Sequence, residues 1–557
     1  MIATAMAFPR PEVDPMPATG PFRRFEPFLA LAYLAGLAAL SVQLQGPPAV
    51  EPATAPADRF SAERAMTHVD AIAARPHPMG SPEAASVRNY LRAELQSLGL
   101  EVRTQTDDKI PGENLIAVRP GSRPGGKAVM LAAHSDSVTE GPGAGDDAAG
   151  VAAILEAVRA LGSGPPIAND LIVLLTDGEE RGLLGAQVFA KDQAWVDRVG
   201  LVLNFEGRGN RGPSYMFETS EGNGRLIREF ARAAPHPMAT SLAYAVYQRM
   251  PNSTDLTIFK EHGLPGLNFA FVDGVEHYHR PTDTPANLDR RSLQHHGSYA
   301  LALARHFGNL DLGGFAPEPD AIYFHAFGPH LVVYPASWAW PLAIAAVVAF
   351  AAVVGWGLHR GRLSARGLAA GLAISLFAIA AATVVPYGLW RIIQPWRTPV
   401  PGKHYTGSPQ VAWGLAAVGL LAALATLWPG RGRASVADRA LGGLAWWLVL
   451  LIAVTAALPG GSYLFLGPFA LGLIGVAATV ARPGLAGPGA YLGAIAALGL
   501  VPPTVQSLCV ALGPSLPFAA APLAGLLVVG IWPVVARILP AGTPTARDPA
   551  MPMGKMG

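Results

Sequence analysis

Cysteine is almost absent from this chain. Among its 557 residues there is a single one, Cys509, and it lies in an apolar run. One cysteine excludes an intrachain disulfide and a thiolate zinc site, so any metal ligands must be nitrogen or oxygen atoms. The chain also has little net charge, with a formal value of +2. No stripe of Lys and Arg with interleaved aromatic residues occurs. These absences argue against nucleic acid as a partner.

Long apolar runs are abundant, but only in part of the chain. The chain is too long for one core, so we expect at least two parts. Up to residue 336 charged and apolar residues mix as in a soluble α/β domain, whereas residues 337–540 contain apolar runs of about 20 residues. Such runs match the ~30 Å hydrocarbon core of a bilayer. We expect about seven spans there, near residues 338–358, 367–390, 411–428, 441–458, 463–481, 491–512 and 518–536.

A further apolar run, residues 28–44, follows Arg23 and Arg24 and has the composition of either a secretory signal or a membrane anchor. We favour the anchor, because the run is long for a signal and no A-x-A cleavage site follows closely. The predicted organisation has seven segments: a cytoplasmic segment (1–27), a transmembrane helix (28–45), a Pro-rich linker (46–58), a soluble domain (59–312), a linker (313–336), a transmembrane domain (337–540) and a cytoplasmic tail (541–557).

Arginine in alternate loops predicts the topology. One set of loops contains Arg360, Arg362, Arg366, Arg431, Arg433, Arg482 and Arg537, whereas the opposite set has Arg397 and Lys403 in its one longer loop. Positive loops stay in the cytoplasm, so residues 46–335 are predicted to lie outside it, in a periplasm or lumen. No predicted span carries a central Asp, Glu or Lys, which weakens a proton-coupled transporter hypothesis.

The soluble domain has an α/β pattern. Short apolar runs at residues 128–133, 171–175, 201–205 and 267–272 are typical of buried strands, and a helical pattern covers residues 151–161. Alternation of this kind predicts a sheet with helices on both faces. Ligands of open α/β sheets bind at the carboxyl ends of the strands.

Polar motifs follow these strands. "AHSDS" places His134 two residues before Asp136, a carboxylate able to orient a metal-bound imidazole. "GAGDDAAG" contains Asp146 and Asp147, and one of two adjacent acids suffices to cap a helix. Residues 143–148 also fit a dinucleotide-binding pattern, but two carboxylates would repel a pyrophosphate. A bridging metal ligand explains the paired acids better.

The remaining motifs supply two glutamates, a further glutamate and a histidine. Glu179 and Glu180 follow a strand, where paired carboxylates repel each other unless a cation is present. One can ligate a metal while the other holds the attacking water. Glu206 ends a third apolar run, and His279 precedes "RPTDT". Each motif alone is weak evidence, but their order together indicates a hydrolytic metal site.

In this order the segments "AHSDS", "GAGDDAAGVA", "LLTDGEERGLLGA", "NFEGRGNRGP" and "YHRPTDT" resemble the co-catalytic zinc exopeptidases of the aminopeptidase Y and glutamate carboxypeptidase II type. With its multi-span C-terminal half, the chain looks most like the membrane-bound branch represented by endoplasmic reticulum metallopeptidase and vacuolar membrane protease. The resemblance is strong over residues 60–312 and makes residues 59–312 a zinc peptidase domain followed by an all-α transmembrane domain.

The resemblance implies a site with two zinc ions. Asp146 would bridge them, often with a cis peptide bond after it, and Glu179 would be the general base. One zinc would add His134 and Glu206 and the other Glu180 and His279.

The resemblance also implies substrate contacts. Tyr278 would contact the tetrahedral intermediate, while Arg208, Thr254 and Asp255 match positions that bind substrate in relatives.

The predicted function is therefore that of a membrane-anchored di-zinc exopeptidase acting on short extracytoplasmic peptides from the N-terminus. Glu206 stands where aminopeptidases of this clan tend to have Asp, so a carboxypeptidase or dipeptidase remains open. Glutaminyl cyclisation fits less well, because those relatives hold a single zinc. A peptide-binding or transport-associated membrane protein is the alternative from another class. Peptide and membrane lipid are the expected partners, and the oligomeric state is not predicted.

Overall fold

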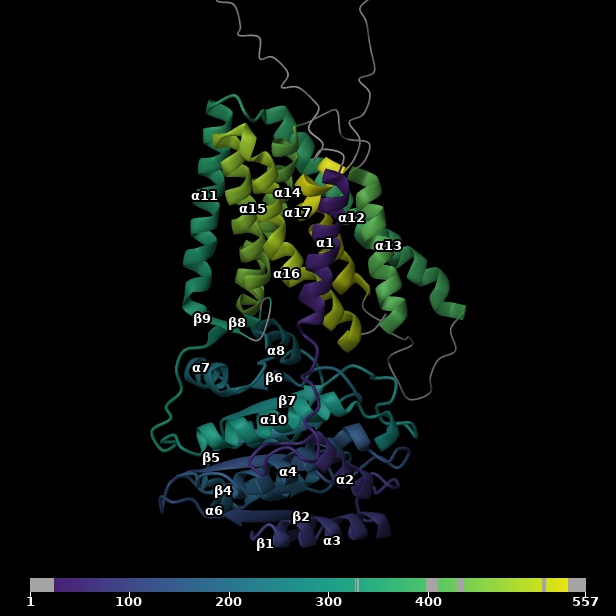
Figure 1. Cartoon of the computed structure of the whole chain (residues 1–557), viewed down its shortest axis with the longest axis vertical. Helices are drawn as coiled ribbons and strands as arrows, with labels where there is room; N and C mark the ends of the chain where they lie inside the picture. The colour runs from purple at the N-terminus through teal and green to yellow at the C-terminus, as the bar shows by residue number, and fades with distance from the viewer. Residues whose placement is uncertain are drawn as a thin grey trace, which may run out of the picture.

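A computed structural model describes residues 25–325, 327, 330–396, 409–427, 435–512 and 517–538. A sheet domain and a bundle of long helices are stacked along the long axis of the molecule (Figure 1). Most of the two predicted cytoplasmic tails lies outside the described residues, as do residue 428 at the end of the predicted span 411–428 and the loop cations Arg397, Lys403, Arg431 and Arg433.

The sheet domain contains a seven-stranded mixed sheet in the order β1-β2-β4-β3-β5-β7-β6. Its strands are β1 (Glu101–Asp107), β2 (Ile110–Arg119), β3 (Ala128–His134), β4 (Leu171–Thr176), β5 (Val199–Gly207), β6 (Tyr215–Thr219) and β7 (Gly266–Phe271). The four central strands β4, β3, β5 and β7 are parallel, while β1, β2 and β6 pair antiparallel at the edges. The four predicted strands are the central ones, and they are buried along their whole length.

Helices cover both faces of this sheet. Because side chains of a strand alternate between faces, Val129 and Leu131 pack into one core while Met130 and Ala132 pack into the other. On the first face lie α2 (Ala62–Ile72), α3 (Pro82–Ser97), α4 (Ala149–Gly162), α7 (Gly224–Ala233) and α10 (Arg290–Phe307). On the second lie α5 (Leu184–Lys191), α6 (Gln193–Val196) and α9 (Asp255–Glu261). The predicted α/β fold class is confirmed.

The bundle contains eight long apolar helices among the described residues, which confirms the predicted all-α multi-span part. They are α1 (Glu26–Gln43), α11 (Ala339–His359), α12 (Ala365–Ile393), α13 (Pro409–Leu427), α14 (Val436–Ala457), α15 (Tyr463–Ala481), α16 (Ala486–Leu512) and α17 (Pro517–Ile538). Phe377 and Val384 on α12 are 67% and 65% exposed, as expected for side chains that face lipid.

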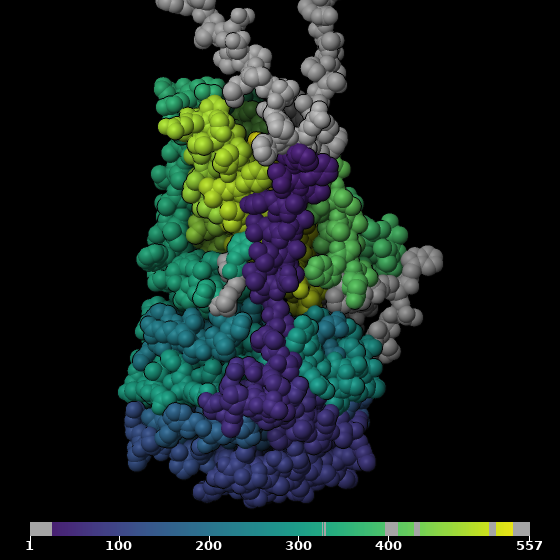
Figure 2. All heavy atoms as spheres, viewed as in Figure 1, coloured from purple at the N-terminus to yellow at the C-terminus, as the bar shows by residue number. Residues whose placement is uncertain are grey.

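The first helix is an integral part of the bundle. α1 packs along α16 and α17, and the Tyr33 hydroxyl donates a hydrogen bond of 2.8 Å to the Tyr491 carbonyl on α16. Figure 2 shows α1 on the face of the bundle, with the following segment running down over the sheet domain. An anchor that only tethered a separate domain would not need such contacts.

Both expected linkers are folded segments. In residues 46–58 the Glu51 amide donates to the Gln294 side chain on α10, and Arg64 donates to the Ala53 and Ala55 carbonyls. In residues 313–336 the strands β8 (Ala321–His325) and β9 (Leu331–Pro335) form an antiparallel hairpin at the junction with the bundle (Figure 1). A Pro-rich composition alone did not indicate these contacts.

Candidate metal centre

The predicted ligands come from four strand ends on one edge of the sheet. His134 is the last residue of β3, and Glu206 lies near the end of β5. Glu180 follows β4, and His279 lies in the loop after β7. Because β3, β4, β5 and β7 are parallel, their carboxyl ends meet at this edge.

Asp146 reaches the same edge from the loop that precedes α4. It is 5% exposed, and the peptide bond between Asp146 and Asp147 is cis. Close backbone packing fixes this loop, because a Cβ atom at Gly207 would lie only 1.9 Å from the Gly145 carbonyl oxygen. Asp283 holds the loop from the other side, since its carboxylate accepts from the amides of Gly145 at 2.8 Å and Asp146 at 3.2 Å.

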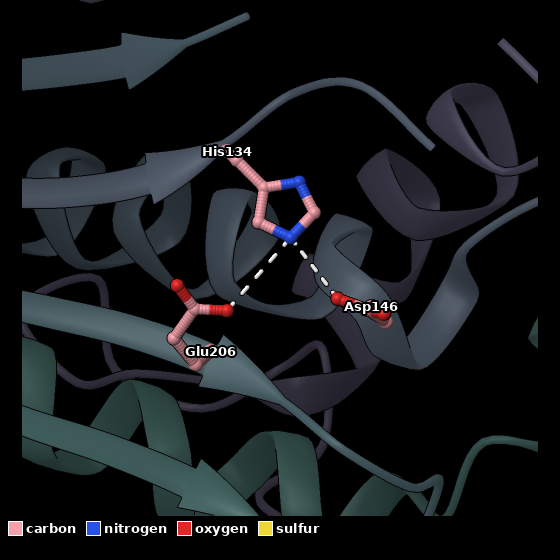
Figure 3. A group of neighbouring side chains, drawn as sticks. All are labelled: His134, Asp146 and Glu206. Carbon is pink, nitrogen blue, oxygen red and sulfur yellow. Dashed lines mark hydrogen bonds and ion pairs between the residues drawn. The ribbon is translucent and has the colours of Figure 1, made fainter. Parts of the chain in front are cut away.

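The first ligand group consists of His134, Asp146 and Glu206. His134 Nε2 lies 3.0 Å from Asp146 Oδ1 and 3.8 Å from Glu206 Oε2. Figure 3 shows the imidazole pointing toward both carboxylates. All three side chains are buried.

The second ligand group consists of Asp146, Glu180 and His279. His279 Nε2 lies 3.0 Å from Asp146 Oδ2 and 3.0 Å from Glu180 Oε2. The two carboxylate oxygens of Asp146 thus face two different histidines, one in each group. A carboxylate in this arrangement can be shared between two cations.

Asp136 links the strand that carries His134 to the loop that carries both glutamates. His134 Nδ1 lies 3.0 Å from the Asp136 carbonyl oxygen and 3.5 Å from its carboxylate. The same carboxylate accepts from the amides of Glu179 at 3.1 Å and Glu180 at 3.3 Å. Outer partners of this kind fix the orientation of a ligating imidazole. Glu179 itself lies beside His134 and Glu180 in a third close group.

The crowding of carboxylates shifts their acidity. Burial, together with the neighbouring Asp146, raises the pKa of Glu180 to about 7. Burial and nearby acids also raise the pKa values of Glu179 and Glu206 well above the ordinary value of a glutamate side chain. Burial would lower the pKa of His279, but its bonds to Asp146 and Glu180 raise it to about 10. A site with this excess of buried acids is one that a cation would stabilise.

The donor set fits zinc. All ligand atoms are imidazole nitrogens or carboxylate oxygens, and those of each group lie within 4.8 Å of one another. Ligands at about 2.0–2.2 Å from a tetrahedral zinc ion are about 3.4 Å apart, so small side-chain shifts would suffice for binding.

The residues predicted to contact substrate differ in their surroundings. The Tyr278 ring stacks on His279 with centroids 3.8 Å apart, and burial raises the pKa of the Tyr278 hydroxyl, while the charge of Arg208 opposes that shift. Thr254, in contrast, caps α9 in a capping box, and buried Asp255 accepts from the Thr176 hydroxyl. Substrate binding by Thr254 and Asp255 therefore stays a prediction, while both have a role in the fold.

Asp283 was not predicted to belong to the site. It lies within "RPTDT", the segment that follows His279. The motif therefore contains Asp283 but does not indicate which groups it bonds. Burial raises its pKa to about 7, although the Gly145 amide opposes that shift. Its two amide contacts show that it positions the Asp146 loop.

Comparison with known proteins agrees with the motif segments. Residues 114–304 match the model of Peptidase family M28. The chain is 30% identical to mouse endoplasmic reticulum metallopeptidase 1 over 228 residues, which cover 40% of this chain and 25% of the mouse protein. It is 28% identical to the vacuolar membrane protease of Candida dubliniensis over 276 residues, covering 46% and 29% of the two chains. The chain thus spans only about a quarter to a third of the length of these relatives. The matches confirm the predicted resemblance.

Solved structures similar to part of this chain include an aminopeptidase and a glutaminyl cyclase. An aminopeptidase from Aneurinibacillus sp. strain AM-1 has a TM-score of 0.37 at 15% identity, covering 47% of this chain and 97% of the other. Glutaminyl cyclase from Porphyromonas gingivalis has a TM-score of 0.36 at 21% identity, covering 44% and 97%.

Proposed function

We propose that the chain is a membrane-embedded zinc metallopeptidase that hydrolyses short peptides from the N-terminus. The observation that carries this proposal is Asp146, whose two oxygens each lie 3.0 Å from a different histidine. Two metal ions sharing this carboxylate would complete a hydrolytic centre. The match of residues 114–304 to Peptidase family M28 supports the same reaction class.

Each residue then has a defined task. Bound zinc would polarise the scissile carbonyl and lower the pKa of a water molecule. Glu179 accepts the proton of the attacking water on its carboxylate and later donates it to the leaving amine. Asp136 holds the loop of Glu179 through the backbone amides and orients His134. Tyr278 donates a hydrogen bond to the oxyanion of the tetrahedral intermediate.

The direction of cleavage can be tested on the full-length protein. The purified chain, supplied with zinc, is given peptides with a free amine, the same peptides with a blocked N-terminus, and peptides with an amidated C-terminus. An aminopeptidase cleaves only substrates whose amine is free. Cleavage that depends instead on a free carboxylate would identify a carboxypeptidase, and cleavage of dipeptides alone a dipeptidase. Zinc-dependent peptide binding without turnover would favour the peptide-binding or transport-associated alternative.

Tyr278→Phe is expected to lower kcat by roughly 10- to 10³-fold with little change in KM, because the hydrogen bond matters chiefly in the transition state. Steady-state kinetics on a free-amine peptide measure both constants, and zinc content shows whether the site is intact. A change in KM alone, with kcat retained, would remove Tyr278 from oxyanion binding.

We also propose that the peptidase domain lies outside the cytoplasm. This proposal rests on the arginine content of alternate loops, including Arg360 and Arg362 after α11. Alkaline phosphatase, which becomes active only outside the cytoplasm, is expected to be active when fused after residue 320 and inactive when fused after residue 362. Measured enzyme activity in the reverse pattern would contradict this topology.

A further inference from the structure

The helix bundle touches the sheet domain through α8 (Ser241–Tyr247), which lies directly beneath the bundle in Figure 1. In the bundle, α8 packs against the short η7 turn (Pro459–Gly461) between α14 and α15. The Ser241 hydroxyl donates a 2.6 Å hydrogen bond to the Gly460 carbonyl, and just past the helix Arg249 donates to the Ala457 carbonyl at 3.2 Å. The start of α8 and the segment just after it are therefore both held where α14 ends and η7 begins.

One helical turn after Ser241, Tyr244 of α8 lies beside an ion pair between half-buried Lys260 and buried Glu218. Tyr244, which is 6% exposed, places its ring 5.7 Å from the ammonium of Lys260 on α9. A cation at this distance is attracted by the face of an aromatic ring. The same ammonium lies 3.0 Å from the carboxylate of Glu218 on β6, which is 4% exposed. Tyr244 and Glu218 together fix the Lys260 side chain.

From Glu218 a chain of buried amides leads to the metal centre. Asn268 on β7 donates to Glu218 at 2.9 Å and to the Thr254 hydroxyl at 2.8 Å. Its carbonyl oxygen accepts from Asn204 Nδ2 at 3.1 Å, and Asn204 Nδ2 lies 3.2 Å from Glu206 Oε1. Asn204 and Asn268 are completely buried, so each of these polar contacts is costly to lose.

We propose that this chain of contacts lets the membrane-embedded bundle hold the zinc ligand Glu206 in place, so that the bundle is a working part of the metal centre as well as an anchor. The positioning residues are Asn204, Asn268, Glu218 and Lys260, and α8 is the connection to the bundle. This inference rests on the proposed zinc peptidase function.

The contacts of Glu206 explain how the network would act on zinc binding. Glu206 Oε2 faces His134, while its other oxygen contacts the amide of Asn204. A ligating carboxylate that is hydrogen-bonded on its second oxygen keeps one orientation, and loss of such an outer partner typically lowers metal affinity or activity about 10- to 100-fold. Lys260 balances the buried charge of Glu218 at the far end of the network. Displacement of α8 would move the Tyr244 ring away from Lys260 and leave Glu218 as the contact that holds the ammonium.

The bundle end of the connection is tested with a matched pair of glycine substitutions in the full-length protein. Gly460 and Gly484 each follow a proline in a short turn between membrane helices. A Cβ atom at Gly460 would lie 2.8 Å from the Ser241 carbonyl oxygen, whereas a Cβ atom at Gly484 would have no atom of the described residues within 4 Å apart from its own turn. Gly460→Ala is expected to weaken zinc binding and lower kcat/KM by about 2- to 30-fold, and Gly484→Ala to change neither.

The network itself is tested at Lys260. Lys260→Met removes the charge that balances Glu218 and is expected to weaken zinc binding by about tenfold, measured by competition with a chromophoric chelator. Lys260→Arg keeps the charge and is expected to restore most of the affinity. The two Lys260 variants also test the proposed network if Gly460→Ala fails to fold.

Wild-type zinc affinity in Gly460→Ala, or equal loss of affinity in Lys260→Met and Lys260→Arg, would overturn the inference. If the wild-type protein itself neither binds zinc nor cleaves peptides, the proposed function fails instead. The two failures are thus distinguishable by the behaviour of the wild-type protein.

Discussion

Glu179→Gln is expected to keep zinc bound and to lower kcat by about 10²- to 10⁴-fold, the usual contribution of a general base. The amide has nearly the size of the carboxylate but cannot accept the proton of the attacking water. The backbone amide of Glu179, which donates to Asp136, remains in place, so the loop should keep its position. Single-turnover kinetics and elemental analysis of zinc measure the two effects.

Glu140→Gln is the control for this substitution, because Glu140 is exposed in the loop that precedes Asp146. It should retain wild-type turnover and zinc. More than a tenth of wild-type activity in Glu179→Gln would contradict the role of general base. Loss of zinc in Glu179→Gln would instead place Glu179 among the ligands, as its closeness to His134 and Glu180 would allow.

Asp146→Ala is expected to empty both metal positions and abolish activity. Its Oδ1 faces His134 and its Oδ2 faces His279, so truncation removes a ligand atom from each group at once. His134→Ala, by comparison, removes a ligand atom from the first of these two groups and leaves the second group complete. Zinc stoichiometry of the purified proteins should therefore fall to near zero in Asp146→Ala and by about half in His134→Ala.

Asp108→Ala serves as the control, since Asp108 lies exposed in the turn between β1 and β2. The melting temperature of each variant shows whether the fold survives. Full zinc content in Asp146→Ala would refute the bridging assignment, and so would loss of only one ion.

The grouping of the proposed ligand side chains could be predicted from the sequence because the signal is local. His134 and Glu206 lie at or near the ends of largely apolar strands, where a charged or titratable side chain is conspicuous. The strands are parallel neighbours in the sheet, so these ends lie side by side. The resemblance then assigned the roles of Asp146 and His279. The four central strands were predictable for the same reason, because strands buried on both faces consist mostly of apolar residues.

The missed features depend on tertiary contacts. β2 and β6 lie at or beside the sheet edges, and their mixed composition does not separate them from loops. The segment expected to be a spacer binds α10 through Glu51 and Gln294, which are 243 residues apart in the chain. Contacts across such separations leave no periodic pattern in either segment. The hydrogen bond from Ser241 to Gly460 also joins distant parts of the chain, 219 residues apart. The proposed connection between the bundle and the metal centre could therefore not be predicted from the sequence.

The most direct test of the account is a zinc titration of the metal-depleted, full-length protein while cleavage of a free-amine peptide is followed. We predict that hydrolysis appears with zinc and reaches its maximum when two equivalents are bound, because the groups around His134 and His279 share Asp146. Failure of zinc to elicit hydrolysis at any ratio, or full activity with a single equivalent, would contradict the two-metal centre.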